Sequence, residues 1–170
     1  IPADVVDHDH LQEAIEGFYR LTDNRQIVFL DIHELMRAKF NKERRMVLTQ
    51  AALVIPVSTL IIRAARFLRL EVPPMRRPYP FIIRLLGILE EKNKSVYLLG
   101  STLKGIRKAE SALRATYPGL QIVGRYSSGF QAERQKDIIS AIKKASPSLL
   151  LASRGLRGRH LWVSRNRGQL

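Results

Sequence analysis

Two short stretches of this sequence hold side chains whose types and spacing could do chemistry. Asp31, His33 and Glu34 follow an apolar run, and a carboxylate close to a histidine can serve as a general base. Gly100-Ser101-Thr102 follows another apolar run and offers backbone N–H groups and hydroxyls suited to a phosphate. Each stretch can equally be a plain helix N-cap, because Asp, Ser and Thr are residues that helix starts prefer.

A third stretch, Gly124-Arg125-Tyr126-Ser127-Ser128-Gly129, could hold a sugar or a phosphate through its hydroxyls and its guanidinium group. A simple turn would explain the same residues. The C-terminal segment 153–170 is basic and contains Trp162. This segment could bind a diphosphate, an anionic surface or RNA, or could form a solvated helix face. Its arginines are Arg154, Arg157, Arg159, Arg165 and Arg167.

Charge is unevenly distributed along the 170 residues. The chain has 29 Lys and Arg against 15 Asp and Glu, a net charge of +14, and residues 101–170 hold 14 of those bases and only three of the acids. This gradient predicts an anionic partner near the second half, such as a nucleotide diphosphate, a lipid headgroup or a nucleic acid. Nucleic acid is the least favoured, because the bases are spread over several predicted elements rather than one recognition helix.

Several classes of protein are excluded by residues that the sequence lacks. Without cysteine there is no disulfide framework, thiolate zinc site or cysteine nucleophile. Walker A, G-x-G-x-x-G, G-x-S-x-G and His-Glu-x-x-His signatures are also missing. His8 and His10 lie two residues apart, a spacing that does not share a helix face, so we predict a polar lead-in and no metal site. The longest apolar run, 51–62, is broken by Pro56 and is too short to span a bilayer.

Apolar runs of strand length alternate with helical periodicity along the chain. The uniformly apolar runs favour strands that are covered on both faces. We therefore predict an α/β fold: a doubly wound, mostly parallel Rossmann-like sheet of about five or six strands, with helices on both faces. We expect one domain over 1–170, with a Pro/Arg loop at about 71–80. The predicted strands are 26–30, 51–55, 95–99, 120–124 and 149–152, and the predicted helices cover about 11–21, 34–45, 59–69, 81–92, 102–117, 132–142 and a stretch starting near 156.

Ligands of such a sheet bind beyond the carboxyl ends of the strands, where the strand order reverses. The candidate ligand-binding stretches are therefore those that follow the predicted strands: 31–34, 56–59, 100–102, 124–129 and 153–158.

The order of features resembles the WecG/TagA/CpsF glycosyltransferase family from about Asp4 to the end of the chain. The resemblance is carried by Val96-Tyr97-Leu98-Leu99-Gly100, by Tyr117-Pro118-Gly119-Leu120-Gln121-Ile122-Val123-Gly124, and by Ile138-Ile139 with Ala145-Ser146-Pro147-Ser148-Leu149-Leu150-Leu151. It implies a metal-independent enzyme that moves an N-acetylhexosaminyl-type sugar from a UDP donor to a lipid-pyrophosphate-linked sugar in bacterial cell envelope polysaccharide synthesis.

The functional positions of that family are changed here. After the first strand the family shows an Asn where this chain has Asp31. After the second strand it has Pro-Asp-Gly, with the Asp as the proposed general base, whereas this chain reads Pro56-Val57-Ser58. A valine can neither take a proton from an acceptor hydroxyl nor accept its hydrogen bond.

Two later motifs of the family are changed as well. Its Gly-x-Asp corresponds to Tyr79-Pro80-Phe81 here, and its Gly-x-Pro-x-Gln-Glu corresponds to the stretch from Gly155 to His160, with Arg159 in place of the Gln. The sequence also ends without the family's arginine-rich C-terminal segment, so we expect the basic segment 153–170 to be truncated.

These departures lead to two hypotheses. The first is a pseudoenzyme of the family that acts as a binding or structural component, and this is the one that the lost motifs favour. The alternative is an active glycosyltransferase that uses a UDP-sugar, with Asp31 or His33 as base.

Partners would be an anionic membrane surface or a protein, reached through the basic C-terminal half, and a homo-oligomer stays open. The expected location is cytoplasmic, extending to the inner face of the cytoplasmic membrane. The predicted substrate-binding residues are Asp31, Pro56, Val57, Ser58, Gly100, Ser101, Gly124, Arg125, Ser127, Ser128, Gly129, Gly155 and Arg159.

Overall fold

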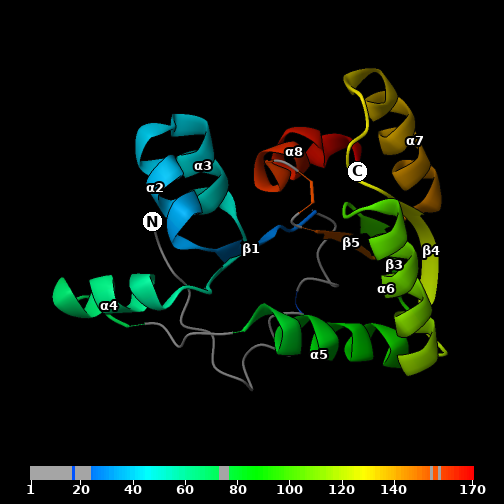
Figure 1. Cartoon of the computed structure of the whole chain (residues 1–170), viewed down its shortest axis with the longest axis horizontal. Helices are drawn as coiled ribbons and strands as arrows, with labels where there is room; N and C mark the ends of the chain where they lie inside the picture. The colour runs from blue at the N-terminus through cyan, green and yellow to red at the C-terminus, as the bar shows by residue number, and fades with distance from the viewer. Residues whose placement is uncertain (1–16, 18–23, 73–76, 154, 157) are drawn as a thin grey trace. The chain divides into compact units, whose positions relative to one another are not determined.

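Five strands, each parallel to its neighbour, alternate with helices in the part of the chain that the computed structural model describes (Figure 1). The structure describes residue 17 and residues 24–72, 77–153, 155–156 and 158–170. The predicted helix over about 11–21 and the pair His8 and His10 lie outside these residues, Gly17 excepted. The chain divides into two compact units, Ile1–Tyr79 and Pro80–Leu170, and each is described by itself.

The first unit is a two-stranded parallel sheet with three described helices. Strand β1 pairs with β2 in a register that sets Val28 beside Val54 and Leu30 beside Pro56. The elements are β1 (Ile27–Leu30), α2 (Ile32–Phe40), α3 (Lys42–Gln50), β2 (Leu53–Pro56) and α4 (Thr59–Phe67).

A single residue, Asn41, divides the predicted helix over 34–45 into two helices. Asn41 has extended backbone angles, with φ −130° and ψ 112°, so the helical path stops there. Its side-chain oxygen then accepts a hydrogen bond of 2.9 Å from the Arg44 backbone N–H, which caps the next helix. The prediction of one helix was therefore wrong, because apolar periodicity cannot register an Asn that both ends and starts a helix.

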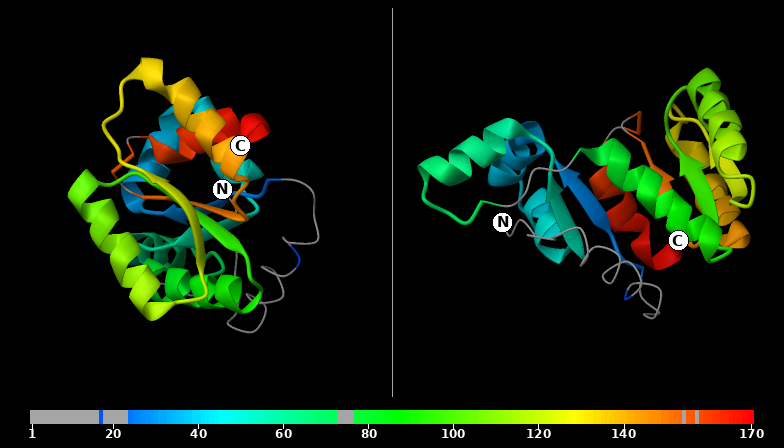
Figure 2. Two further views of the ribbon diagram at one scale, coloured as in Figure 1. Left: turned by 90° about the vertical axis from the view of Figure 1, so that its right-hand side faces the viewer. Right: turned by 90° about the horizontal axis from the view of Figure 1, so that it is seen from below.

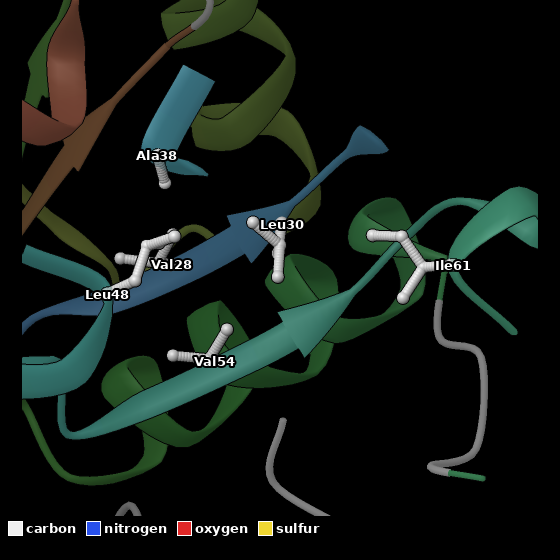
Figure 3. Close-up of a cluster of buried hydrophobic side chains, with 6 residues drawn as sticks. All are labelled: Val28, Leu30, Ala38, Leu48, Val54 and Ile61. Atoms are coloured by element: carbon white, nitrogen blue, oxygen red, sulfur yellow. The ribbon is translucent and has the colours of Figure 1, made fainter. Parts of the chain in front are cut away.

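A buried cluster in the first unit combines six side chains from both strands and all three described helices. Figure 3 shows Val28 and Leu30 projecting from β1 toward residues of the helices that cover the sheet. The cluster comprises Val28, Leu30, Ala38, Leu48, Val54 and Ile61. This packing fixes the carboxyl ends of β1 and β2, where the candidate residues of this unit lie.

The second unit is a three-stranded parallel sheet in the order β4-β3-β5, with β3 in the centre. The chain passes from β3 to β4 on one side and then returns across β3 to β5 on the other. Right-handed connections in opposite directions place α6 and α7 on opposite faces of the sheet, as Figure 2 shows. The elements are α5 (Pro78–Glu91), β3 (Ser95–Leu99), α6 (Leu103–Thr116), β4 (Gln121–Tyr126), a 3₁₀ turn (Ala132–Arg134), α7 (Gln135–Ala145), β5 (Leu149–Ala152), α8 (Arg159–Asn166) and a second 3₁₀ turn (Arg167–Gln169).

One face of the central strand is covered by α7 and by the end of the chain. Tyr97 and Leu99 of β3 point to this face and pack with Ile138 and Ile142 of α7 and with Leu156. Partly buried aromatic side chains extend the cluster, with the rings of Phe130 and Trp162 in edge-to-face contact at 6.3 Å between centroids. The basic C-terminal segment is thus tied to the core through its apolar residues.

The α/β class and the parallel strands are confirmed, but the single sheet of about five or six strands is wrong. Every strand pairing that the structure describes lies inside one unit, which gives a sheet of two strands and a sheet of three. Apolar runs indicate where strands form, whereas backbone hydrogen bonds between particular strands decide which of them share a sheet.

The predicted loop at 71–80 also ends earlier than expected, because Pro78 and Pro80 lie in the first turn of α5, where proline is tolerated.

Candidate functional site

The carboxyl ends of β3 and β5 lie side by side at the point where the strand order of the second unit reverses. The chain after β3 leads into α6 on one face of the sheet, whereas the chain after β5 leads to Leu156, which packs with α7 on the other face. This is the position at which open α/β sheets bind their ligands. Three segments meet here: 100–102 after β3, 127–129 after β4, and residues 153, 155 and 156 after β5. We call them the junction.

The first segment of the junction begins with two residues in left-handed backbone conformations. Gly100 has φ +100° and Ser101 has φ +66°, and a positive φ is costly for serine but not for glycine. The helix cap that follows is supplied by Thr102, whose hydroxyl accepts a hydrogen bond of 3.1 Å from the Gly105 backbone N–H. Thr102 therefore satisfies the capping requirement, and Ser101 is held in a strained conformation that the cap does not explain.

Ser128 fastens the second segment of the junction to the first. Its backbone N–H and its hydroxyl both donate to the Ser101 carbonyl oxygen, at 2.7 Å and 2.6 Å. Gly100 also donates its N–H to the Tyr126 carbonyl oxygen at 2.9 Å. These bonds bring the predicted residues Ser101 and Ser128 together and help to hold Ser101 in its strained conformation.

The third segment approaches so closely that only glycine fits. A Cβ atom on Gly155 would lie 2.5 Å from the Ser101 backbone nitrogen and 3.0 Å from the Ser128 hydroxyl oxygen. A Cβ atom on Gly100 would lie 2.6 Å from the hydroxyl oxygen of Ser153. The structure thus brings together four predicted residues, Gly100, Ser101, Ser128 and Gly155, together with Ser153, which the sequence placed only within a candidate stretch. The signal for Ser153 was its position directly after an apolar strand.

The junction presents hydroxyl and backbone groups of several residues within a few ångströms of one another. Such groups can donate hydrogen bonds to phosphate oxygens or exchange them with sugar hydroxyls. Ser127 and Gly129, the latter with φ +84°, adjoin Ser128 in the same segment. The arrangement is suited to binding a polar, anionic small molecule, and it places no carboxylate among the three segments.

Arg125 differs from its predicted place. It lies inside β4 rather than in a loop, and its guanidinium group forms an ion pair with the Glu110 carboxylate of α6. The same carboxylate also pairs with Arg114 at 3.0 Å. The predicted loop was therefore wrong, and Arg125 is engaged in an ion pair with an acid 15 positions away that nothing in the nearby sequence signals.

Gly124 is explained by packing. A Cβ atom at this position would lie 2.3 Å from the ring of Tyr97, so the tyrosine can lie against β4 only because residue 124 is a glycine. Burial, with a smaller contribution from Tyr126, raises the pKa of Tyr97 above its ordinary value of 10.0. A direct role of Gly124 in substrate binding stays a prediction.

Arg159 is the first residue of α8 and follows Gly158, whose φ of +61° forms the turn into the helix. It is half-buried and has interaction partners of its own. The neighbouring His160 is buried, with 8% of its surface exposed. Arg154 and Arg157 lie outside the described residues, so the predicted arginine cluster stays a prediction.

The remaining candidates lie at the carboxyl edge of the first unit. Asp31 caps α2, because one of its carboxylate oxygens accepts a hydrogen bond of 2.8 Å from the Glu34 backbone N–H. Glu34 in turn forms an ion pair of 2.7 Å with Arg44. Two of the three residues of the proposed base stretch are thus engaged in local structure, and the third, His33, is exposed.

Val57 lies beside Asp31 at that edge. The paired residues Leu30 and Pro56 are the last of their strands, so Asp31 and Val57 follow neighbouring strand ends, and the Val57 backbone N–H donates to the Leu30 carbonyl oxygen at 3.0 Å. Ser58 precedes α4 without a side-chain cap. Within the described residues, no group of three or more His, Cys, Asp or Glu side chains is placed to hold a metal ion.

Comparison with known proteins places this α/β chain among the glycosyltransferases: it belongs to the Glycosyl transferase WecG/TagA/CpsF family, which it matches over residues 1–170. It is also similar to the N-acetylglucosaminyldiphosphoundecaprenol N-acetyl-beta-D-mannosaminyltransferase of Bacillus subtilis (strain 168), with 24% identity over 109 residues. The matched segment covers 64% of this chain and 42% of the relative, so it corresponds to less than half of that protein. The predicted family is thus confirmed.

Proposed function

We propose that this chain is a divergent member of its family that binds a nucleotide-sugar donor, such as a UDP-sugar, without the family's catalytic mechanism. The observation that supports donor binding is the junction, where Ser101, Ser128 and Gly155 meet at the reversal point of the second sheet. A diphosphate and a sugar need several hydrogen-bond donors held in place before they bind, because ordering them on binding would cost affinity. The two hydrogen bonds that Ser128 donates to the Ser101 carbonyl oxygen hold Ser101 in place, so its hydroxyl is positioned before a ligand binds.

Two residues of the first unit, Val57 and Asp31, support the proposed loss of catalysis. Val57 stands where the resemblance places the general base, and an aliphatic side chain cannot move a proton. The nearest carboxylate along the strand ends, Asp31, is engaged as a helix cap. A protein that retains its donor site and lacks its base would act as a binding or structural component, reaching a protein or an anionic membrane surface through its basic C-terminal half.

A second candidate function is an active transferase with a rearranged site. The observation in its favour is the register of β1 and β2, which sets Asp31 and Val57 on neighbouring strand ends. Asp31 has a second carboxylate oxygen besides the one that caps α2, and that oxygen could accept a proton from a sugar hydroxyl. By analogy with the relative from Bacillus subtilis, the acceptor would be a lipid-diphosphate-linked N-acetylglucosamine.

Calorimetric titration with UDP, UDP-N-acetylglucosamine and UDP-N-acetylmannosamine, at low and moderate salt, tests donor binding. We expect saturable binding that depends on the sugar and survives salt, because salt screens attraction to a +14 surface more than contacts in a built site. Ser128→Ala should weaken binding up to about tenfold, because it removes the hydroxyl that holds the Ser101 carbonyl oxygen in place, and one hydrogen bond is worth about 0.5–1.5 kcal/mol. The matched control is Ser111→Ala on the exposed side of α6, which should bind as wild type. Equal binding by both variants, or none that survives salt, would refute the proposal.

Transfer to a lipid-diphosphate-linked acceptor separates the two candidates. We expect no transfer above background from the wild-type chain. If transfer occurs, Asp31→Asn decides whether Asp31 is the base, because Asn caps a helix about as well as Asp but cannot take a proton. Transfer that Asp31→Asn abolishes, with unchanged stability, would establish the active alternative.

A further inference from the structure

Helix α4 and the turn after it expose large apolar side chains next to arginines. Leu60 is 52% exposed, Phe67 87%, Leu68 62% and Leu70 59%. We call these four residues, together with Arg63, Arg66 and Arg69, the α4 surface. None of its residues lies in the junction or at the candidate edge of the first unit, so the proposed function leaves this surface unexplained.

The helical spacing divides α4 into three faces. Ile61, which is buried, and the half-buried Ile62 and Ala65 form the face toward the core of the first unit. Leu60 and Phe67, seven residues apart, lie on an exposed face, and Leu68 lies on the side of that face nearer the core. Arg63 and Arg66 lie three residues apart on the opposite side of this apolar face. The helix therefore presents an apolar stripe bordered by positive charge, in addition to the stripe that it buries.

Hydrogen bonds within the turn after α4 fix its backbone, and the backbone in turn sets the positions of the exposed side chains. The Leu70 backbone N–H donates to the Ala65 carbonyl oxygen at 2.9 Å, and the Arg69 N–H donates to the Arg66 carbonyl oxygen at 3.1 Å. These are the two bonds of a Schellman motif. Arg69 occupies its left-handed position with φ +54°, where glycine is usual. The motif presents Phe67, Leu68 and Leu70 close together.

The charges of the α4 surface are of one sign. Residues 59–70 contain three arginines and no acidic residue, and the exposed Glu71 that follows forms no ion pair with these arginines. Within the part of the chain that the structure describes, none of these three guanidinium groups takes part in an ion pair, and all three side chains are exposed. The α4 surface therefore combines solvent-exposed apolar side chains with arginines that have no acidic partner in the described part of the chain. A complementary partner would have an apolar layer with negative charges just above it.

We propose that the α4 surface binds to the interface of an anionic lipid bilayer. Phe67, Leu68, Leu70 and Leu60 would enter the boundary between headgroups and acyl chains, and the arginines would bind lipid phosphates, because a guanidinium group can reach up to the headgroups while its stem lies along the apolar region. No helix among the described residues is both long and apolar enough to cross a bilayer, so the contact is interfacial. This surface belongs to the first unit, and the proposal does not depend on donor binding.

The absence of cysteine from the chain makes a direct test possible. A single cysteine introduced by Leu70→Cys is labelled with the environment-sensitive fluorophore NBD, and the emission is followed with phosphatidylcholine vesicles with and without phosphatidylglycerol. We expect a blue shift and an intensity gain with anionic vesicles only. The same label at Phe40→Cys on α2, where the phenylalanine is 80% exposed, should respond little. Equal responses at the two sites, or equal responses to neutral and anionic vesicles, would overturn the proposal.

Co-sedimentation with the same vesicles tests the side chains. Phe67→Ser with Leu68→Ser should lower the partition coefficient about tenfold or more, since each exposed apolar side chain adds hydrophobic binding energy. The matched double variant Met36→Ser with Phe40→Ser removes exposed apolar residues from α2 and should bind as wild type. Arg63→Gln with Arg66→Gln should lower binding about tenfold and reduce its salt dependence, whereas Lys104→Gln with Lys108→Gln on α6 should have little effect.

Three further results would overturn the membrane assignment. The first is undiminished vesicle binding by the Phe67→Ser, Leu68→Ser variant, because attraction to the +14 charge alone would then explain it. The second is an NBD label at position 70 that is already in an apolar environment without vesicles, which would mean that protein covers this surface. The third is a change of this variant from dimer to monomer in sedimentation equilibrium, without a change in vesicle binding. All the substituted side chains are exposed, so circular dichroism should show unchanged folding in each variant.

Discussion

Ser101 shows how a single residue can join backbone strain to a site. Its φ of +66° is unfavourable for any residue with a Cβ atom, and its carbonyl oxygen is the acceptor for both donors of Ser128. Structures keep such strain where the surroundings over-determine the conformation, which happens most often at binding sites. The strain at Ser101 therefore supports the junction as the donor site.

We predict that Ser101→Gly raises the free energy of unfolding by about 0.5–1 kcal/mol. The left-handed conformation costs a serine about 1–2 kcal/mol, which the glycine avoids. The greater conformational freedom of glycine in the unfolded chain reduces this gain in stability. Urea unfolding measures the change. The matched control, Ser111→Gly inside α6, should lower stability by about 0.5 kcal/mol. If the serine hydroxyl contributes to the site, donor affinity should fall in Ser101→Gly while stability rises; a loss of stability would contradict the assigned strain.

Gly124 and Gly155 show why residue types alone did not separate packing from binding. Both were predicted as substrate-binding glycines. Gly155 does lie in the junction, whereas Gly124 leaves space for the Tyr97 ring, which a Cβ atom would approach to 2.3 Å. A glycine signals that something lies close to the backbone, and only the fold shows whether that neighbour belongs to the site or to the core.

At the scale of elements, Asn41 sets the boundary between two helices of nine residues each. Its extended backbone ends α2, and its side chain caps α3. Helix starts are specified by short polar side chains, so the feature was present in the sequence, but the apolar periodicity on either side obscured it. Similarly, the prolines of 71–80 predict a loop, although the first turn of α5 accommodates both Pro78 and Pro80.

We predict that Asn41→Ala lowers the free energy of unfolding by about 1 kcal/mol, because the Arg44 backbone N–H loses its acceptor at the start of α3. Asn41→Asp retains an acceptor and should be close to wild type. Urea unfolding followed by circular dichroism measures both variants. Unchanged stability together with increased helicity in Asn41→Ala would mean that α2 and α3 can join into one helix, and would contradict the capping role.

At the scale of the whole molecule, the chain forms two compact units, each with its own parallel sheet and its own buried cluster. The candidate base lies in the first unit and the junction in the second. The expectation of one domain over 1–170 stays a prediction. The charge gradient follows the same division in part, since most of the positive excess lies beyond residue 100.

Tyr97 connects the core of the second unit to the stability of the molecule at high pH. Burial raises its pKa, so in the folded state the phenol stays protonated when the unfolded chain has begun to lose that proton at its ordinary value of 10.0. The unfolded state then binds fewer protons, and stability falls as pH rises. The contribution of the neutral phenol is complete below pH 10 and is lost as pH rises through the folded-state pKa.

We predict that Tyr97→Phe makes the decline of unfolding free energy above pH 10 shallower, because the phenylalanine has no proton to lose. The control is Tyr79→Phe, which removes a phenol from a side chain that is 74% exposed. Urea unfolding at a series of alkaline pH values measures both. Parallel curves for wild type and Tyr97→Phe would show that the phenol ionises equally in both states.

The sequence by itself determined the α/β class, the family, the positions of the strands and several residues of the junction. The strand positions could be predicted from the sequence because local apolar runs specify them. Strands β3 and β5 have the predicted bounds, Ser95–Leu99 and Leu149–Ala152. Only the tertiary structure decided that the strands form sheets of two and three, that Glu110 holds Arg125, and that Ser128 and Gly155 meet at Ser101. Those facts depend on contacts between residues far apart in the sequence, which local propensity and spacing do not encode.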